Sequence, residues 1–324
     1  LNITVNDQLP AVSYSASVLI LTNNTASTDL PHVPVISGAG LITSWEINNT
    51  NLPSGLVFGI NNGTIYGIPT QLWPETQYKI WGNNSGGTTL SEVTITVNDQ
   101  LPTLAYNPHN ITLTNNTVSP DLPLVPAVNG SGIITSWELN DTSLPSGISF
   151  GSNNGTIYGV ATQLWPNTAY KVWANNTGGS VEFYFNLTVI DQVPTLGYNP
   201  ITLTLTNNTI SSNLPLSPTI TGSGVITSWE LEDTALPNGI SFGASNGTFY
   251  GVPTQLWPTK TYTVWANNSG GAIPATITIT VNDQLPNNIS YNPESITLVN
   301  NTVSSDLPLS PSINGPGFIT SWEL

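Results

Sequence analysis

The chain has 324 residues, with 18 acidic side chains, three Lys and no Arg, which gives a net charge of −15. This composition offers no basic patch for a nucleic acid or an anionic membrane surface. The absence of Cys excludes disulfides, thiolate zinc sites and thiol nucleophiles. No apolar run approaches the roughly 18 residues of a membrane-spanning helix, so no membrane span is predicted within this sequence.

The sequence repeats itself with a period of 92 residues. The Asp of an NDQLP-like string recurs at Asp7, Asp99, Asp191 and Asp283, and the Trp of ITSWE recurs at Trp45, Trp137, Trp229 and Trp322. A period of this length suits a self-contained small domain. We predict complete repeats at 8–99, 100–191 and 192–283, with 1–7 as the last strand of a preceding repeat and 284–324 as the first half of a further one. These ends suggest a window onto a longer tandem array.

Within the first repeat, runs of β-branched and aromatic residues predict strands at 18–21, 41–47, 77–81 and 93–97. Residues 58–66 predict a hairpin, because Asn62-Gly63 favours the positive φ of a tight turn. None of these segments has the 3.6-residue period of a helix. About seven strands per repeat, with turns every 8–12 residues, predict an all-β sandwich with almost no helix.

Motifs of the form GxITSWE, LPSGLxF, NGTIYGxPT, TxYxVWAxNSGG and ITVNDQLP follow one another in each repeat. In this order they resemble the He_PIG immunoglobulin-like repeats, and the cadherin-like domains, of bacterial and archaeal surface proteins. The resemblance spans the whole chain, repeat by repeat. It implies tandem Ig-like β-sandwich domains in an extracellular or cell-surface protein. Such repeats build stalks, adhesins and fibres, mostly without catalytic function.

The Trp residues form three equivalent sets with different predicted roles. Two sets are expected to fill the core, because a sandwich without a disulfide needs large apolar volume at its centre; they are Trp45, Trp137 and Trp229, and Trp81, Trp173 and Trp265. The third set precedes Pro in a turn and is the best candidate for exposure, to a neighbouring repeat or to a sugar: Trp73, Trp165 and Trp257. Tyr78, Tyr170 and Tyr262 are predicted tyrosine corners, whose hydroxyl ties a loop to a strand.

The sequence contains 17 N-x-Ser/Thr sequons, several of which recur in register. The recurring candidates for N-glycosylation are Asn23, Asn115, Asn207 and Asn300; Asn62, Asn154 and Asn246; and Asn83, Asn175 and Asn267. They also have a plain explanation, because Asn, Thr and Ser are common in β-turns. Glycans on an exported chain would solubilise a surface on which charged residues make up only 6%.

The string at the repeat junction resembles the cadherin linker DxNDxxP, which implies a possible Ca²⁺ site at Asp99, Asp191 and Asp283. The pattern is incomplete, since Thr96 stands where the linker motif has its first Asp and Ile190 replaces the Asn in one copy. The alternative is a rigid, Pro-limited joint in which the Asp caps a turn. No other cofactor is indicated.

No enzyme is predicted. The two His residues, His32 and His109, occupy non-equivalent positions, and the motifs of hydrolases, metalloproteases and phosphate-binding loops are missing. We therefore expect a structural stalk or filament outside the cell, N-glycosylated and contacting neighbouring copies of itself. The alternative is an adhesin whose exposed Trp residues bind surface glycans, and a third possibility is a spacer joined to another domain.

Overall fold

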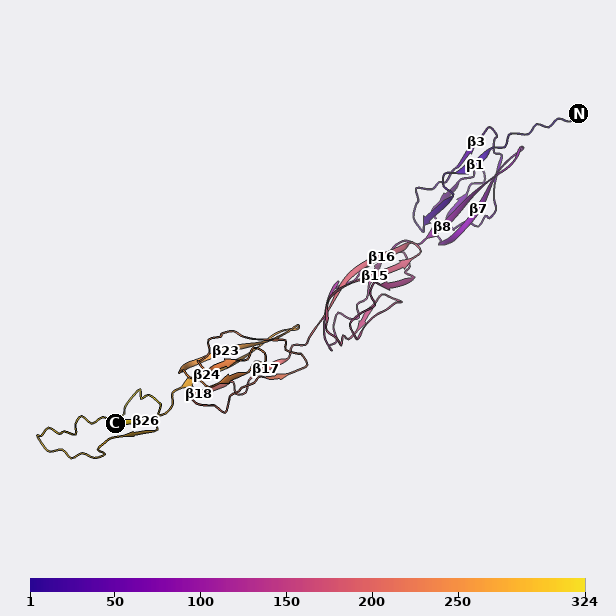
Figure 1. Cartoon of the computed structure of the whole chain (residues 1–324). Helices are drawn as coiled ribbons and strands as arrows, with labels where there is room; N and C mark the ends of the chain where they lie inside the picture. Colours follow the sequence, from indigo (N-terminus) through magenta and orange to yellow (C-terminus); the bar gives the residue numbers. More distant parts are fainter. Residues whose placement is uncertain (324) are drawn as a thin grey trace. The chain divides into compact units, whose positions relative to one another are not determined.

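The computed structural model describes residues 1–323. No helix occurs in that range, so none could span a membrane. The prediction of tandem β-sandwiches is confirmed. The chain divides into two compact units, Leu1–Val189 and Ile190–Leu324, and each is described by itself. The first unit holds the first two repeats, and the second holds the third repeat and the partial fourth (Figure 1).

The first repeat has two sheets. Its strands are β1 (Ala11–Tyr14), β2 (Val18–Thr22), β3 (Pro34–Ser37), β4 (Ser44–Ile47), β5 (Leu56–Phe58), β6 (Ile65–Gly67), β7 (Trp73–Asn84) and β8 (Gly87–Asn98). One sheet has the order β2-β8-β7-β4, with β2 parallel to β8. The pairs β1-β3 and β5-β6 form the other layer, where an isolated bridge joins His32 to Ile65.

The second repeat has the same order, β10-β16-β15-β12, in its large sheet, and so does the third, β18-β24-β23-β20. The strands of the second are β9 (Thr103–Ala105), β10 (Asn110–Thr114), β11 (Ala127–Asn129), β12 (Ser136–Leu139), β13 (Ile148–Phe150), β14 (Ile157–Gly159), β15 (Trp165–Asn176) and β16 (Gly179–Ile190). Those of the third are β17 (Thr195–Gly197), β18 (Thr202–Thr206), β19 (Thr219–Thr221), β20 (Ser228–Leu231), β21 (Ile240–Phe242), β22 (Phe249–Gly251), β23 (Trp257–Asn268) and β24 (Gly271–Asn282).

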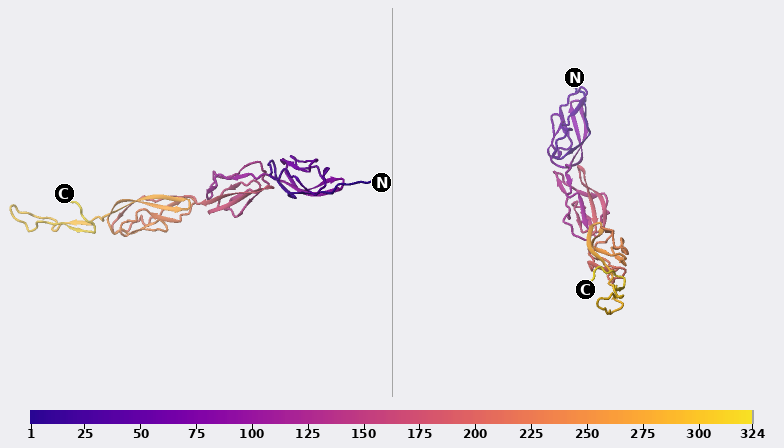
Figure 2. Two further views of the ribbon diagram at one scale, coloured as in Figure 1. Left: turned by 90° about the horizontal axis from the view of Figure 1, so that it is seen from above. Right: turned by 90° about the vertical axis from the view of Figure 1, so that its left-hand side faces the viewer.

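Two details differ from the sequence-based expectation. Each repeat has eight strands rather than about seven, because the first strand is split: its first half pairs with β3 and its second half pairs with β8 in the other sheet. Residues 1–7, which were expected to form the last strand of a preceding repeat, form no strand. Among residues 284–323 the only strands are β25 (Asn288–Ser290) and β26 (Ser312–Asn314), which pair with each other, and most of this segment is loop (Figure 2, yellow).

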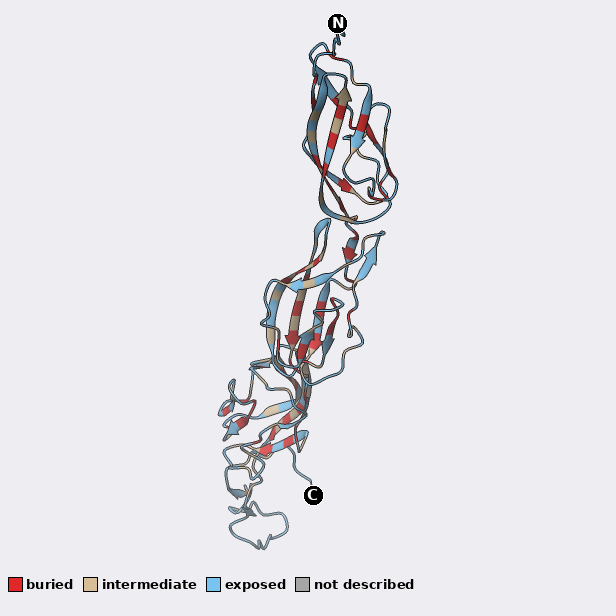
Figure 3. Ribbon diagram, turned by 90° about the vertical axis from the view of Figure 1, so that its right-hand side faces the viewer, coloured by how far each residue is buried: buried red, intermediate tan, exposed pale blue. Residues whose placement is uncertain are grey.

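The long hairpin of β7 and β8, and its equivalents, supplies the centre of each core. Along β7 the inward side chains of Tyr78 and Ile80 are fully buried, and along β8 those of Val93 and Ile95 are too. Buried residues alternate with exposed or half-buried ones along these strands (Figure 3), as expected where one face of a sheet packs on a core and the other does not. Within residues 1–323 the buried apolar side chains form three cores, one in each complete repeat.

The tyrosine at the centre of each hairpin ties the core to a loop. In the second repeat the fully buried Tyr170 donates its hydroxyl to the carbonyl of Ser143 (2.9 Å) and accepts the indole N–H of Trp165 (3.1 Å). Tyr78 donates to the Asn51 carbonyl at 2.9 Å, and Tyr262 donates to the Ala235 carbonyl at 2.8 Å. Each is the geometry of a tyrosine corner.

A second tyrosine in each repeat fixes the Asn-Gly turn. Tyr106 is buried and donates to the carbonyl of Gly155 at 2.6 Å, and Tyr198 does the same to Gly247 at 2.5 Å. Gly155 has a φ of +70°, and a Cβ on it would lie 2.4 Å from the ring of Trp137. Glycine is therefore required both for the backbone conformation and for the indole that covers it.

We expect Tyr170→Phe to lower the free energy of unfolding by about 1–3 kcal/mol, because the Ser143 carbonyl and the Trp165 indole N–H both lose their partner. Denaturant unfolding of the full chain measures this change in the transition of the second repeat. Tyr158→Phe is the matched control, since Tyr158 is 47% exposed, and its effect should stay within about 0.5 kcal/mol. Equal effects of the two substitutions would contradict the role of the corner.

The buried phenols predict a loss of stability in alkali. Burial raises the pKa of Tyr106 and of Tyr198 well above the usual value, so the folded repeats keep these phenols protonated. An unfolded phenol ionises near pH 10, so these tyrosines leave the free energy of unfolding unchanged below about pH 10. Above that pH, each buried tyrosine lowers the free energy of unfolding by about 1.4 kcal/mol for every further pH unit. Melting temperatures between pH 8 and pH 11.5 test this, and Tyr106→Phe should reduce the slope. A slope unchanged by that substitution would refute it.

Candidate functional site

The junction between the first and second repeats is held by Asp99. This residue is buried, and one carboxylate oxygen accepts the backbone N–H of Gln100 (2.8 Å) while the other accepts that of Ile133 (2.8 Å). The Asp99 N–H donates to Thr177 Oγ1 at 2.9 Å. Ile133 precedes β12 and Thr177 lies in the turn between β15 and β16. A single linker residue therefore anchors two loops of the second repeat.

Gln100 bonds to both repeats. Its Nε2 donates to the carbonyl of Asn23, in the turn after β2, at 2.9 Å. Its own carbonyl accepts Nδ2 of Asn176 at 2.7 Å. A Cβ on Gly132 would lie 1.9 Å from that carbonyl oxygen, so only glycine allows the loop of the second repeat to approach this closely. Gln100 thus connects the end of the first repeat to the loops of the second.

The same contacts recur at the other linkers. One carboxylate oxygen again accepts a loop N–H: Asp7 from Leu41 (3.0 Å), Asp191 from Val225 (2.9 Å) and Asp283 from Phe318 (3.0 Å). Gln284 repeats the contact of Gln100, donating to the Asn207 carbonyl at 2.7 Å. We call the Asp and Gln of each linker, with the loop groups they bond, the linker clamp.

The linker clamp does not fit a calcium ion. Calcium takes six to eight oxygen ligands, usually with several carboxylates. Within residues 1–323 no group of three or more His, Cys, Asp or Glu lies close enough together to hold a metal, and both oxygens of Asp99 already accept N–H groups. At Asp99, Asp191 and Asp283 one carboxylate oxygen accepts the N–H of the next residue, as in an Asp that caps a turn, and the Ca²⁺ site stays a prediction.

The structure corrects the predicted position of one set of Trp residues. Trp81, Trp173 and Trp265 are half-buried on the outer face of the large sheet, because their neighbours on either side along the strand point into the core. Trp45 and Trp229 are buried, and Trp137 is half-buried against its core. The period of two along a strand decides this difference, since it turns every second side chain away from the core.

The third Trp set, which precedes Pro, is less exposed than residues that stack against a sugar would be. Trp73, Trp165 and Trp257 are half-buried and pack against the three cores. The indole N–H of Trp165 and that of Trp257 donate to the tyrosine corner at 3.1 Å and 3.0 Å. These indoles cover the corner, so their polar edge points inward rather than toward a ligand.

The sequons differ in how accessible their Asn side chains are. Asn62, Asn154 and Asn246 are exposed in the turn between β5 and β6 and its equivalents, where each side-chain oxygen accepts the N–H of the sequon Thr. Asn300 is also exposed. Asn83, Asn175 and Asn267 are half-buried in the long hairpins. The remaining three, Asn23, Asn115 and Asn207, are half-buried beside the junctions.

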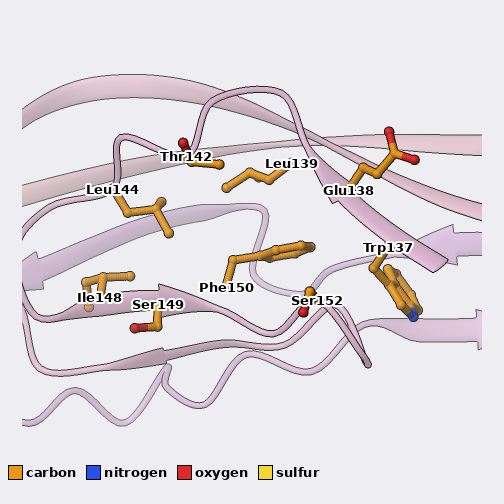
Figure 4. A pocket seen from close by; sticks show the side chains of 9 residues that line it. All are labelled: Trp137, Glu138, Leu139, Thr142, Leu144, Ile148, Ser149, Phe150 and Ser152. Carbon is orange, nitrogen blue, oxygen red and sulfur yellow. The ribbon is translucent and has the colours of Figure 1, made fainter.

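An apolar groove recurs where the two sheets leave the sandwich open. In the second repeat it lies between β12 and β13 and is lined by Trp137, Leu139, Leu144 and Phe150, with Phe150 at its centre (Figure 4). Its volume is about 570 Å³ there and about 620 Å³ in the third repeat, against about 250 Å³ in the first. The groove contains no cluster of titratable groups of the kind a reaction would need.

Sequence reasoning placed Gln100 in the Pro-limited joint without a bonding role, and it did not single out Asn176 or Tyr106. Each of them recurs 92 residues away, at Gln192, Asn268 and Tyr198, so recurrence was a signal for all three. The repeat pattern does not reveal which group each residue bonds to, because partners such as Gln100 and Asn23 lie 77 residues apart in the sequence.

Comparisons with known proteins agree with this architecture. The family described as "Putative Ig domain" matches the chain twice, over residues 102–190 and 193–282. A "Serine-rich adhesin for platelets" of Staphylococcus aureus is 27% identical over 171 residues, and that of strain MSSA476 is 26% identical over 176 residues. Each alignment covers 50% of this chain but only 7% of the adhesin.

Among solved structures, three domains of Drosophila N-cadherin are 14% identical, with a TM-score of 0.35, covering 84% of this chain and 99% of that one. The titin fragment I67-I69 is also 14% identical, with a TM-score of 0.33, covering 86% of this chain and 100% of the fragment.

We expect Asp99→Asn to destabilise the second repeat by about 1–3 kcal/mol, because the amide presents an N–H2 group to a backbone donor where the carboxylate presented an oxygen. Calorimetry of the full chain measures the shift of the corresponding transition. Asp29→Asn is the control, since Asp29 is exposed and its substitution should change little. If both variants melt like the parent, the linker clamp does not support the fold.

Proposed function

The chain belongs to the family described as "Putative Ig domain", and we propose that it is a structural stalk or filament on the cell surface or outside the cell. Domains of this family are non-enzymatic, so the prediction that the chain is not an enzyme is confirmed by its family. The relatives named adhesins support a surface or extracellular protein with an adhesive or structural role.

The observation that carries the proposal is the linker clamp. The same Asp bonds to a loop of the following repeat at Asp7, Asp99, Asp191 and Asp283. Asp99 and Asp191 are buried, which a flexible tether would not need. Gln100 adds a bond to the preceding repeat. Each repeat also has its own core, so it can unfold without unfolding its neighbours, as suits a protein under tension.

Features of the surface favour a protein that is covered by glycans or by neighbouring chains. Only three ion pairs occur within residues 1–323, and all involve exposed or half-exposed side chains, which contribute little stability. Strands β2 and β4 are open edges of the large sheet, and open edges invite pairing with another chain unless something protects them. We propose that N-linked glycans protect these edges in a stalk, or that neighbouring copies of the chain pair with them in a filament.

Adhesion is the second candidate function. The relatives' name favours it, and surface glycans or a second copy of the chain are the partners it would need. The half-buried position of Trp73, Trp165 and Trp257 weakens the version in which these residues form the sugar platform. The apolar groove between β12 and β13 and its equivalents offers a different surface for such a partner.

Pulling on the full chain by single-molecule force spectroscopy tests the mechanical role. A row of independent repeats should unfold in separate steps, each lengthening the chain by about 300 Å, since about 92 residues extend by roughly 3.3–3.6 Å each. Asp99→Asn should lower the force of one step and leave the others unchanged, with Asp29→Asn as the control. A single unfolding event at low force would overturn the proposed stalk.

A further inference from the structure

An outward Trp precedes a sequon Asn by two residues in every long hairpin. The pairs are Trp81 and Asn83, Trp173 and Asn175, and Trp265 and Asn267. In each strand the residue between them is buried and both partners are half-buried. Because side chains two apart in a strand lie on the same face, Trp and Asn stand side by side on the outer face of the large sheet. Each of these rings offers a large apolar surface on the outer face of the sheet.

The surroundings of Asn175 leave room beside the indole. Its cross-strand neighbours are small: Ser136 on β12 and Ser180 on β16. Together with Glu138, Trp173 and Asn175 they line a shallow, open hollow of about 420 Å³. In the first repeat the neighbours of Asn83 are Ser44 and Thr88, and in the third those of Asn267 are Ser228 and Ala272. The cross-strand neighbours of the sequon Asn therefore have small side chains in all three repeats.

The other flank of Trp173 is already occupied. On the same face the residue two before it is Lys171, whose Nζ lies 4.9 Å from the centre of the Trp173 ring and forms an ion pair with Glu182. Trp173 also lines the hollow beside Asn175. A sugar on Asn175 would reach the indole from the direction of this hollow.

The Asn amide is held in a fixed orientation. Nδ2 of Asn175 donates to Glu138 Oε1 (2.8 Å) and to Ser136 Oγ (3.2 Å), and Nδ2 of Asn83 donates to Glu46 Oε1 (3.1 Å). A sugar attached to this nitrogen replaces one of its two hydrogens and leaves the other to donate to the carboxylate. Hydroxyls of the sugar would find further acceptors and donors in Glu138 and the two Ser side chains.

We infer that the first sugar of an N-linked glycan on Asn83, Asn175 and Asn267 packs its C–H-bearing face against Trp81, Trp173 and Trp265. The inference rests on the proposed glycosylation and goes beyond it, because it assigns the outward Trp as a platform for the chain's own glycan. The pyranose ring covers the indole, and the indole in turn orders the glycan against the hairpin.

The exposed Asn154 provides a matched control. The residue two before it is Ser152 rather than an aromatic, and its sequon caps a turn. A glycan on Asn154 therefore has no aromatic ring two residues before its Asn, although it is attached to the same repeat as a glycan on Asn175.

The test uses the full chain, expressed in a host that glycosylates exported proteins. Peptide mass spectrometry first measures the occupancy of Asn175 and Asn154. Melting of the second repeat is then compared among the parent, Asn175→Gln, Trp173→Thr and the double variant, with Asn154→Gln in both Trp173 backgrounds. We expect Asn175→Gln to lower the melting temperature by about 4 °C when Trp173 is present, and not to lower it further in Trp173→Thr.

Each outcome decides one of the claims. Equal effects of Asn175→Gln in both backgrounds, with Asn175 occupied, would overturn the stacking and leave glycosylation standing. Occupancy of Asn154 but not of Asn175 would also overturn it. An intact mass equal to the bare 34.4 kDa would overturn the glycosylation itself and the inference with it. Direct contacts between indole and sugar protons in the nuclear Overhauser spectrum would support the stacking independently of stability.

Discussion

The alternation of the long hairpin is the constraint on which the rest of each repeat depends. Because side chains along a strand point to opposite faces in turn, the choice that sends Tyr78 and Ile80 inward also sends Trp81 and Asn83 outward. The inward set builds the core and the tyrosine corner. The outward set builds the face where a sequon meets an aromatic ring. One backbone geometry therefore fixes both the stability of the repeat and the chemistry of its surface.

A domain with few charges and no disulfides must be held together by other contacts, and here these are hydrogen bonds between aromatic side chains and the backbone. Two tyrosines in each repeat reach across to loop carbonyls, at positions such as Tyr170 with Ser143 and Tyr106 with Gly155. Buried polar groups are costly unless they are paired, so each of these bonds also selects one loop conformation. The loops that they order follow β12 and β13.

The linker clamp, too, is held together with few charged residues. Asp99 is one of few charged residues that the fold buries, and it is stabilised by backbone N–H groups instead of a cation. A carboxylate satisfied in this way requires neither a metal nor a basic partner. The junction is thereby adapted to a chain in which Lys is rare and Arg is absent.

The sequence by itself determined the repeat, the all-β sandwich, the hairpin at Asn62-Gly63 and the identity of the corner tyrosines, because these depend on local pattern and on recurrence at a fixed spacing. It placed Trp81 in the core, since an apolar strand of aromatic and β-branched residues does not reveal which of its two faces is covered. Only the tertiary structure decided that face, through the pairing of β7 with β8 and β4. It also decided the partners of Asp99 and Gln100, which lie 34 and 77 residues away. Such contacts depend on how distant loops meet, and no local pattern carries that information.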